Sequence, residues 1–229
     1  MSEMEKRNRR LLQELAREYK CGKDGKNKRE RFMYDGAISY SDYEKATRRV
    51  VFLLKDANEQ SEGWALSQIP DLKEYSETGE IKWGKKIIPR RLCLMYEVIV
   101  GEKYEDKHKY LREVAYVNVK KDGGESQCYK SVLNKYAKAY GEYLLRQLKG
   151  LEPDIIVCGG TFEALVREIM QIEYKAGARF EDKTKEKGYF TWHIGTKNVK
   201  IVNMFHPSYT RKGYWDDKKY ISEFKKRLG

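Results

Sequence analysis

Runs of apolar residues alternate along the chain with amphipathic stretches, in the order typical of an α/β domain. Four runs indicate buried strands because they are continuous rather than alternating, and they cover residues 50–54, 114–119, 155–158 and 201–205. Apolar positions recur at helical spacing in residues 3–19, 41–49, 89–100, 131–148, 162–172 and 216–228. Alternation of this kind predicts an α/β sandwich with a largely parallel sheet and right-handed crossovers.

The segments between these elements are polar. Residues 21–31 are rich in lysine and predict an exposed loop, and the charged stretch 173–187 predicts a loop or an insertion. Residues 189–194 form either a hairpin or a pair of neighbouring strands with 198–204. The interval 59–86, which contains Trp64 and Trp83, is long and irregular. A loop of this length in a compact domain is usually functional or disordered.

The length of 229 residues suits one domain with a large core. We therefore expect a single domain over 1–229, in which residues 1–40 form a basic N-terminal helical arm.

The formal net charge is +12, and the 47 lysines and arginines are spread along the whole length. Such a balance favours a polyanionic partner, because nucleic acid releases condensed counterions when it binds basic groups. The 18 tyrosines and four tryptophans suit base stacking as well as core packing. No basic stretch carries a strong apolar face, so DNA is a better partner than a membrane.

Several classes of protein are disfavoured. No apolar stretch approaches the ~18 residues that span a bilayer, and residues 1–19 show a charged helical pattern rather than a signal peptide. The four cysteines are scattered with no C-x-x-C pair, so neither a zinc site nor an iron–sulfur cluster is indicated; they are Cys21, Cys93, Cys128 and Cys158. We expect a cytoplasmic monomer without a cofactor.

Two strand ends carry polar side chains suited to catalysis. The run 50–54 breaks into Lys55-Asp56-Ala57-Asn58, and the run ending at Phe205 breaks into His206-Pro207-Ser208. Pro207 fixes its own φ and favours an extended backbone at His206, which aims the imidazole. In open α/β sheets, ligands bind at the carboxyl ends of the strands. We therefore expect both strand ends to meet at one pocket.

The order of these motifs resembles the uracil-DNA glycosylase superfamily. In that superfamily a first strand ends in a motif of the type G-Q-D-P-Y-H, a middle strand ends in Asn, and a late strand ends in H-P-S. The corresponding residues are Lys55 to Asn58, Asn118 and His206 to Ser208. The resemblance covers about residues 45–215, although the first motif lacks its Gly and its Pro. It implies a three-layer α/β/α sandwich with a mostly parallel four-stranded sheet.

The resemblance also implies a division of labour for cleavage of an N-glycosidic bond. Either Asp56 or Asn58 orients the attacking water, and His206 donates a hydrogen bond to the departing base as a neutral imidazole. Asn118 offers a donor and an acceptor to the edge of an extruded base, and Lys55 is a second candidate for contact with the base. Either Trp64 or Trp83 stacks on the base.

DNA contacts are expected around the same strand ends. Ser208, the backbone of Gly159 and Gly160, and Thr161 at a helix N-terminus suit phosphate oxygens. Tyr209 or Arg211 would fill the gap left by the base, since the residues after Ser208 lack the usual leucine wedge. The basic rim is expected to consist of Arg90, Arg91, Lys120, Lys121, Arg211 and Lys212.

These observations favour a monofunctional DNA glycosylase that needs no metal. A branch of divergent members removes bulky modified bases from phage DNA, and the small Ala57-Asn58 tip is compatible with a roomy pocket. The expected substrate is a bulky pyrimidine such as glucosylated hydroxymethylcytosine, or uracil. The alternatives are a catalytically silent reader of modified or damaged DNA and, less favoured, a metal-dependent nuclease that uses Asp56, Glu59 and His206.

Overall fold

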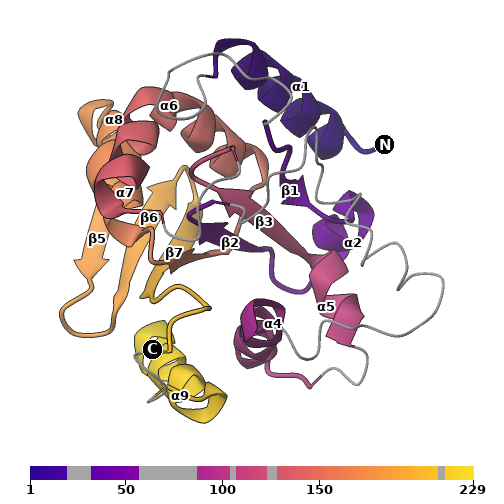
Figure 1. Cartoon of the computed structure of the whole chain (residues 1–229), viewed down its shortest axis with the longest axis vertical. Coiled ribbons are helices and arrows are strands. Elements are labelled where there is room, and N and C mark those ends of the chain that lie inside the picture. The colour runs from indigo at the N-terminus through magenta and orange to yellow at the C-terminus, as the bar shows by residue number, and fades with distance from the viewer. Residues whose placement is uncertain (20–31, 57–86, 104–106, 123–127, 211–214) are drawn as a thin grey trace.

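The computed structural model describes residues 1–19, 32–56, 87–103, 107–122, 128–210 and 215–229. One mixed sheet crosses this part of the chain (Figure 1) in the strand order β1-β3-β2-β4-β7-β6-β5. The strands are β1 (Gly36–Ala37), β2 (Val50–Leu54), β3 (Val114–Asn118), β4 (Ile155–Gly159), β5 (Arg179–Lys183), β6 (Tyr189–Ile194) and β7 (Lys197–Met204).

The expectation of a four-stranded sheet was wrong, because the sheet has seven strands. Its parallel centre consists of β3, β2, β4 and β7. The short β1 pairs antiparallel with β3, and β6 and β5 extend the other edge as antiparallel strands. The parallel centre corresponds to the four continuous apolar runs, whereas the additional strands lie at the edges.

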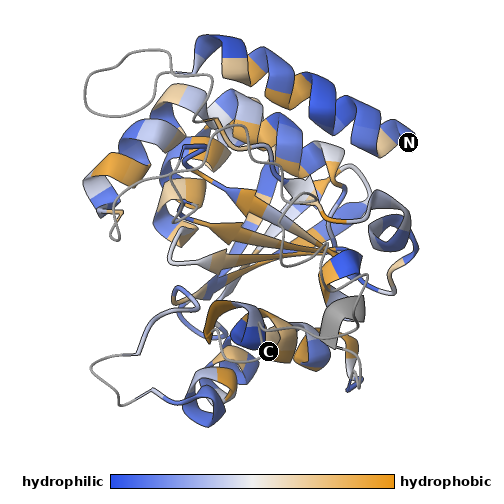
Figure 2. Ribbon diagram, turned by 45° about the vertical axis from the view of Figure 1, so that its right-hand side comes forward, coloured by the Kyte–Doolittle hydropathy of each residue, from blue (hydrophilic) through white to orange (hydrophobic). Residues whose placement is uncertain are grey.

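Helices cover both faces of the sheet, as the views in Figure 1 and Figure 2 show. Helices α1, α6, α7 and α8 lie on one side, and α4 and α9 lie on the other. The bounds are α1 (Glu3–Glu18), α2 (Tyr40–Lys45), α4 (Ile87–Val100), α5 (Lys107–Glu113), α6 (Lys130–Gly150), α7 (Phe162–Ala164), a π-helix (Leu165–Ile169), α8 (Met170–Lys175) and α9 (Asp217–Leu228).

The central strand β2 shows why its sequence has no polar alternation. All five of its residues are buried. Val51 and Leu53 belong to the core cluster under α6, and Val50 and Phe52 belong to the cluster under α4 and α9. Because successive side chains point to opposite faces, a strand covered on both faces must be apolar at every position.

The structure corrects two points of the sequence-based expectation and resolves one open alternative. The charged stretch 173–187 contains β5, an edge strand with mostly exposed side chains that pairs with β6. Residues 189–194 and 197–204 form a hairpin, which is one of the two arrangements expected. Helix α2 ends at Lys45, before the expected end at residue 49.

Helix α1, in the expected N-terminal arm, buries Leu11, Leu12 and Leu15 and packs against α6.

Within the described residues, no helix combines the length and the apolar character that crossing a membrane requires.

Candidate active site

The four parallel strands end at one edge of the sheet, and their registers place the ends side by side. Leu54 of β2 pairs with Asn118 of β3, Leu53 pairs with Cys158 of β4, and Gly159 pairs with Met204 of β7. The residues that follow these positions therefore share one edge. They are Lys55 and Asp56, Lys120, Gly160 and Thr161, and His206.

Two glycines at the end of β4 allow the neighbouring strand ends to approach each other. A Cβ at Gly159 would lie 2.4 Å from Leu54 Cδ2 and 3.1 Å from Pro207 Cδ. At Gly160, which has a φ of +72°, a Cβ would lie 3.1 Å from Lys55 Cε and 3.6 Å from His206 Cβ. The structure therefore brings the two motifs of residues 55–56 and 206–208 together across a narrow glycine spacer.

Asn118 ends β3 with a buried amide that has no hydrogen-bond partner. Its side chain is 1% exposed, and both Oδ1 and Nδ2 lack a partner in the described part of the chain. An unsatisfied buried polar group costs on the order of 1–3 kcal/mol. Because the amide offers one acceptor and two donors, it fits a ligand edge that presents both a donor and an acceptor.

A buried ion pair between Asp35 and Lys121 holds the backbone of Asn118. Asp35 Oδ2 accepts the backbone N–H of Asn118 at 2.7 Å and the Nζ of Lys121 at 2.6 Å. Gln147 of α6 contacts both members of the ion pair. Its Nε2 donates to Asp35, and its Oε1 accepts from Lys121. Asn8 of α1 donates to the Asp35 carbonyl. Sequence reasoning missed Asp35, which has no motif around it.

The imidazole of His206 is held through its Nδ1 atom. Ser208 Oγ lies 2.7 Å from Nδ1, and the backbone N–H of Ser208 donates to the same atom at 3.3 Å. A nitrogen that accepts from these donors carries no proton, so Nε2 carries it. Burial and, secondarily, the positive charge of Lys55 lower the pKa of His206 to about 4. His206 is therefore a neutral Nε2–H donor at neutral pH.

Asp56 is a half-buried carboxylate beside Lys120. Lys120 Nζ lies 3.9 Å from Asp56 Oδ2 and 3.3 Å from Asp122 Oδ2. Burial raises the pKa of Asp56, the charges of Lys120 and Lys55 oppose that rise, and Asp122 adds to it. The carboxylate thus becomes a stronger base than an ordinary aspartate and suits a water-orienting role.

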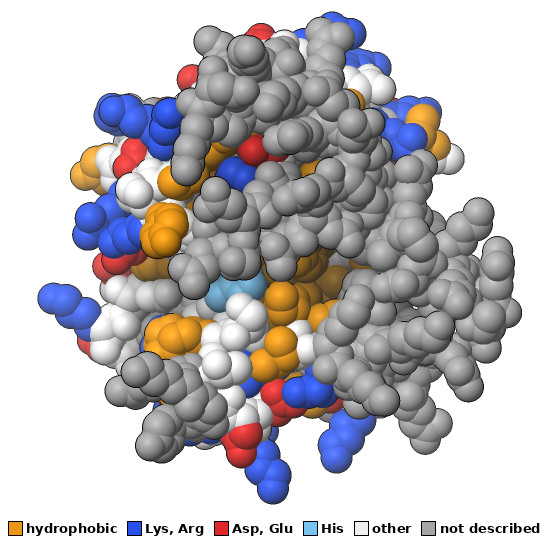
Figure 3. Space-filling view, in the orientation of Figure 1, with side chains coloured by type: hydrophobic (Ala, Val, Ile, Leu, Met, Phe, Trp, Pro, Cys, Tyr) orange, Lys and Arg blue, Asp and Glu red, His pale blue; other side chains and the backbone are white. Residues whose placement is uncertain are grey.

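Of the residues expected to contact phosphate, some are buried and others are exposed. The expectation that Lys121 and Lys120 form a basic rim does not match their placement, because they are 1% and 7% exposed and are paired with Asp35 and Asp122. Thr161 is also buried. It occupies the N-cap position of α7, as expected, but its hydroxyl donates to the Leu53 carbonyl and makes no capping hydrogen bond. Ser208 is exposed. In Figure 3 a histidine lies near the middle of the visible face with hydrophobic side chains beside it, and lysine and arginine side chains gather at the margins.

Tyr209 packs within the protein. Its ring stacks on Phe205 with 4.8 Å between centroids and meets the edge of Trp215 at 5.5 Å. Its N–H donates to the His206 carbonyl at 2.8 Å and closes a turn around Pro207. The proposed wedge role for Tyr209 would require this ring to leave Phe205.

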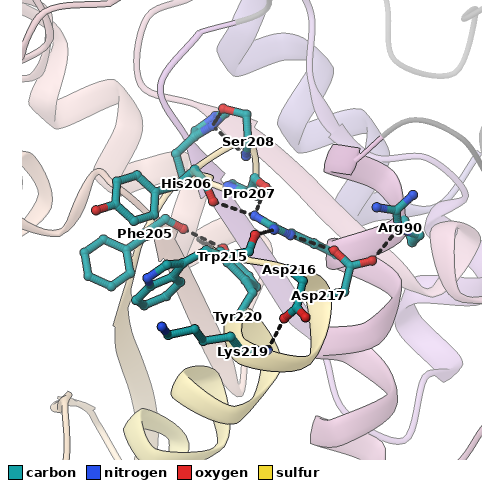
Figure 4. A network of polar contacts seen from close by, with 12 residues as sticks. Arg90, Phe205, His206, Pro207, Ser208, Trp215, Asp216, Asp217, Lys219 and Tyr220 are labelled. Atoms are coloured by element: carbon teal, nitrogen blue, oxygen red, sulfur yellow. Dashed lines mark hydrogen bonds and ion pairs between the residues drawn. The ribbon is translucent and has the colours of Figure 1, made fainter. Parts of the chain in front are cut away.

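Arg91 of α4 was expected in the basic rim, but sequence reasoning missed its actual contacts. Its side chain is 1% exposed and donates to carbonyls of the segment that carries His206 and Ser208 (Figure 4). The sequence signal was an arginine within an otherwise apolar helix face, next to Leu92.

Six expected site residues lie outside the described residues, and they are Asn58, Glu59, Trp64, Trp83, Arg211 and Lys212. Among the described residues, no three His, Cys, Asp or Glu side chains come together as metal ligands. Among the described cysteines, Cys93, Cys128 and Cys158 form no disulfide and lie on separate segments.

Comparison with known proteins gives a partial match. No family model matches the sequence. The type-4 uracil-DNA glycosylase of Archaeoglobus fulgidus is 32% identical to the chain over 87 residues, which are 38% of this chain and 41% of that protein. The chain therefore spans less than half the length of the curated relative it matches. Over that part, it is similar to a uracil-DNA glycosylase.

Proposed function

We propose that the chain is a monofunctional DNA glycosylase that hydrolyses the N-glycosidic bond of a base extruded from DNA. The buried, unpartnered amide of Asn118 carries this proposal, since it lies at the same sheet edge as the neutral imidazole of His206. The partial similarity to a uracil-DNA glycosylase supports the same reaction class. The net charge of +12 supports DNA as the partner.

The proposed reaction needs no metal or cofactor. As the bond between the sugar C1′ and the base nitrogen breaks, the electron pair leaves with the base and the sugar becomes cationic. The Nε2–H of His206 donates to the departing base anion, and the Asp56 carboxylate stabilises the cationic sugar. Water adds to C1′ and gives its proton to Asp56 or to solvent. Asn118 holds the base edge in place throughout.

A neutral imidazole suits this reaction better than an imidazolium. A second positive charge beside a cationic sugar would oppose its formation. Lys55 already contributes one charge near His206 and lowers the pKa of the imidazole. The site thus combines a neutral donor for the leaving group with an anion for the sugar.

The substrate is proposed to be a pyrimidine with a bulky C5 group, such as glucosylated hydroxymethylcytosine, in preference to uracil. The support is the small Ala57-Asn58 tip in the sequence, where a ring would exclude C5 groups. Action on such a base would place the protein in antiphage defence in the cytoplasm. Both double-stranded and single-stranded DNA are candidate substrates.

The test is an abasic-site assay in EDTA. DNA duplexes and single strands that carry uracil, a deaminated purine or glucosylated hydroxymethylcytosine are incubated with the protein and then treated with alkali. We expect strand cleavage at the modified base, abolished in His206→Ala and in Asp56→Ala. His193→Ala is the matched control, because that imidazole contacts Asn198 in the β6–β7 hairpin, outside the site.

The outcomes separate the alternatives. Binding to modified DNA without abasic sites on any of these substrates would reject the glycosylase and favour a silent reader. Strand breaks that require added metal would favour a nuclease. Efficient uracil removal with no action on the bulky base would retain the glycosylase and reject the proposed substrate.

A further inference from the structure

The segment after β7 is held by one buried arginine from a distant helix. Arg91 lies in α4, more than a hundred residues before this segment, and its side chain is 1% exposed. Its Nη1 donates to the carbonyls of Pro207 at 2.9 Å and Tyr209 at 2.7 Å, and its Nη2 donates to the carbonyl of Trp215 at 2.6 Å. Three main-chain acceptors of one segment thus converge on one guanidinium.

The charge of Arg91 is compensated within the same cluster. Nε donates to Asp217 Oδ1 at 2.9 Å, and the guanidinium carbon lies 4.3 Å from the centroid of the Tyr220 ring. Arg90 donates to the other oxygen of Asp217 at 2.5 Å. A buried charge is tolerated only when it is paired and hydrogen-bonded, and these contacts meet that condition.

The geometry links this cluster to the imidazole. The carbonyls of Pro207 and Tyr209 flank Ser208, and Ser208 supplies both donors that reach His206 Nδ1. The Tyr209 N–H closes the turn onto the His206 carbonyl. Figure 4 shows His206, Pro207 and Ser208 of this turn joined through the polar network to Asp217 and Arg90. Fixing both neighbours of Ser208 therefore fixes the two donors.

We propose that Arg91 is a positioning residue for His206: its guanidinium holds the turn 206–209 so that Ser208 keeps the proton of the imidazole on Nε2. Arg91 does not contact the reacting atoms and acts through Ser208. Lysine cannot replace it, because an ammonium on a flexible stem lacks the planar set of donors that reaches three carbonyls and a carboxylate at once. The catalytic consequence rests on the proposed glycosylase, whereas the effect on the imidazole does not.

The experiment measures the tautomer and the titration of His206 directly by NMR of ¹⁵N-histidine-labelled protein. The chain has three histidines, and His206→Gln assigns the relevant signals. In the wild type we expect protonation at Nε2 and a pKa of about 4. In Arg91→Lys we expect a mixture of tautomers. We also expect a pKa that moves toward 6.5, the ordinary value, because a loosened turn exposes the ring and burial is the main cause of the low pKa. Lys55 is the charge that faces the ring and is unchanged in both proteins.

Arg227→Lys is the matched control. Arg227 also donates to a carbonyl of β7, that of Asn203 at 2.7 Å, and it covers the ring of Phe205 at 4.8 Å. Neither of these contacts is with a residue of the turn 206–209. We expect Arg227→Lys to lower stability without changing the tautomer of His206. If Arg91→Lys fails to fold, Asp217→Asn, which removes the carboxylate partner of Arg91, should produce a partial shift in the same direction.

The outcomes distinguish this proposal from the proposed function. An unchanged tautomer and pKa of His206 in the folded Arg91 variant, or in Asp217→Asn if only that protein folds, would overturn the positioning role. A changed tautomer together with no abasic sites from the wild type would retain the positioning role and reject the glycosylase. If the wild type is active, kcat should fall at least tenfold in Arg91→Lys, with KM nearly unchanged.

Discussion

The backbone N–H of Asn118 donates to Asp35 Oδ2 at 2.7 Å, so a carboxylate from outside β3 holds the end of that strand. The same carboxylate is paired with Lys121, and both side chains are 1% exposed. The backbone of Asn118, whose side-chain amide is unpartnered, is therefore held by a buried ion pair. A weakening of that support should affect both the stability of the domain and the placement of Asn118.

Asp35→Asn should lower the free energy of unfolding by about 3–5 kcal/mol, because it leaves the buried Lys121 ammonium without its carboxylate. Burial already lowers the pKa of Lys121, and Asp35 opposes that effect. Urea denaturation at neutral pH measures the change. Asp42→Asn, which breaks an exposed pair with Arg112, should cost less than about 1 kcal/mol. Equal losses in the two variants would contradict a buried support.

His206 should make the protein less stable as the pH falls from 6.5 to 4. The native pKa is about 4, below the ordinary value of 6.5. Between these values the unfolded chain binds a proton at this residue and the native protein does not, so acid favours unfolding. The difference in unfolding free energy between the wild type and His206→Gln, measured from pH 4 to 8, should change in this interval and stay constant above it. A constant difference throughout would disprove the low pKa.

The parallel centre of the fold was predictable because full burial leaves a direct trace in sequence. Val50 to Leu54 and Ile155 to Cys158 are apolar at every position, since helices cover both faces of these strands. β5 left no such trace. Its charged residues Arg179 to Lys183 form an edge strand only through pairing with β6, and edge strands often carry charge.

The site was predictable where a residue stands at a strand end and was missed where a role depends on distant contacts. His206 and Asp56 follow apolar runs, so their position at one edge follows from the parallel topology. Lys121 also follows such a run but turns into the core, because Asp35 compensates its charge there. Nothing near Asp35 or Arg91 in the sequence indicates their long-range partners.

Ser208→Ala should lower kcat about tenfold and leave DNA binding nearly unchanged, if the protein is the proposed glycosylase. The single hydroxyl proton of Ser208 is directed to His206 Nδ1 at 2.7 Å, so it is not available to a phosphate oxygen. Loss of a hydrogen bond of this kind corresponds to about 1–1.5 kcal/mol. Single-turnover excision and a binding titration at several salt concentrations separate the two roles. Weaker binding with a smaller salt dependence would instead assign Ser208 to a phosphate.

Gly159→Ala should disturb the contact between the strand ends and lower activity without unfolding the protein. Its Cβ would lie 2.4 Å from Leu54 Cδ2 and 3.1 Å from Pro207 Cδ, so the Leu54 side chain must shift and Pro207, which follows His206, must move by a few tenths of an ångström. Overpacking of this kind costs about 1–3 kcal/mol, less than the stability of a typical domain. Gly150→Ala is the control, because a Cβ there meets nothing within 4 Å and alanine favours a helix.

The midpoint of thermal unfolding should therefore be lower in Gly159→Ala than in the wild type. In Gly150→Ala it should be equal to that of the wild type or higher. Excision by Gly159→Ala should fall severalfold, since a movement of Pro207 also shifts the adjoining His206 away from its position opposite Lys55 and Asp56. Full activity in a destabilised Gly159→Ala protein would show that the close approach across this glycine serves packing alone, and that the reaction does not depend on the spacing of these two strand ends.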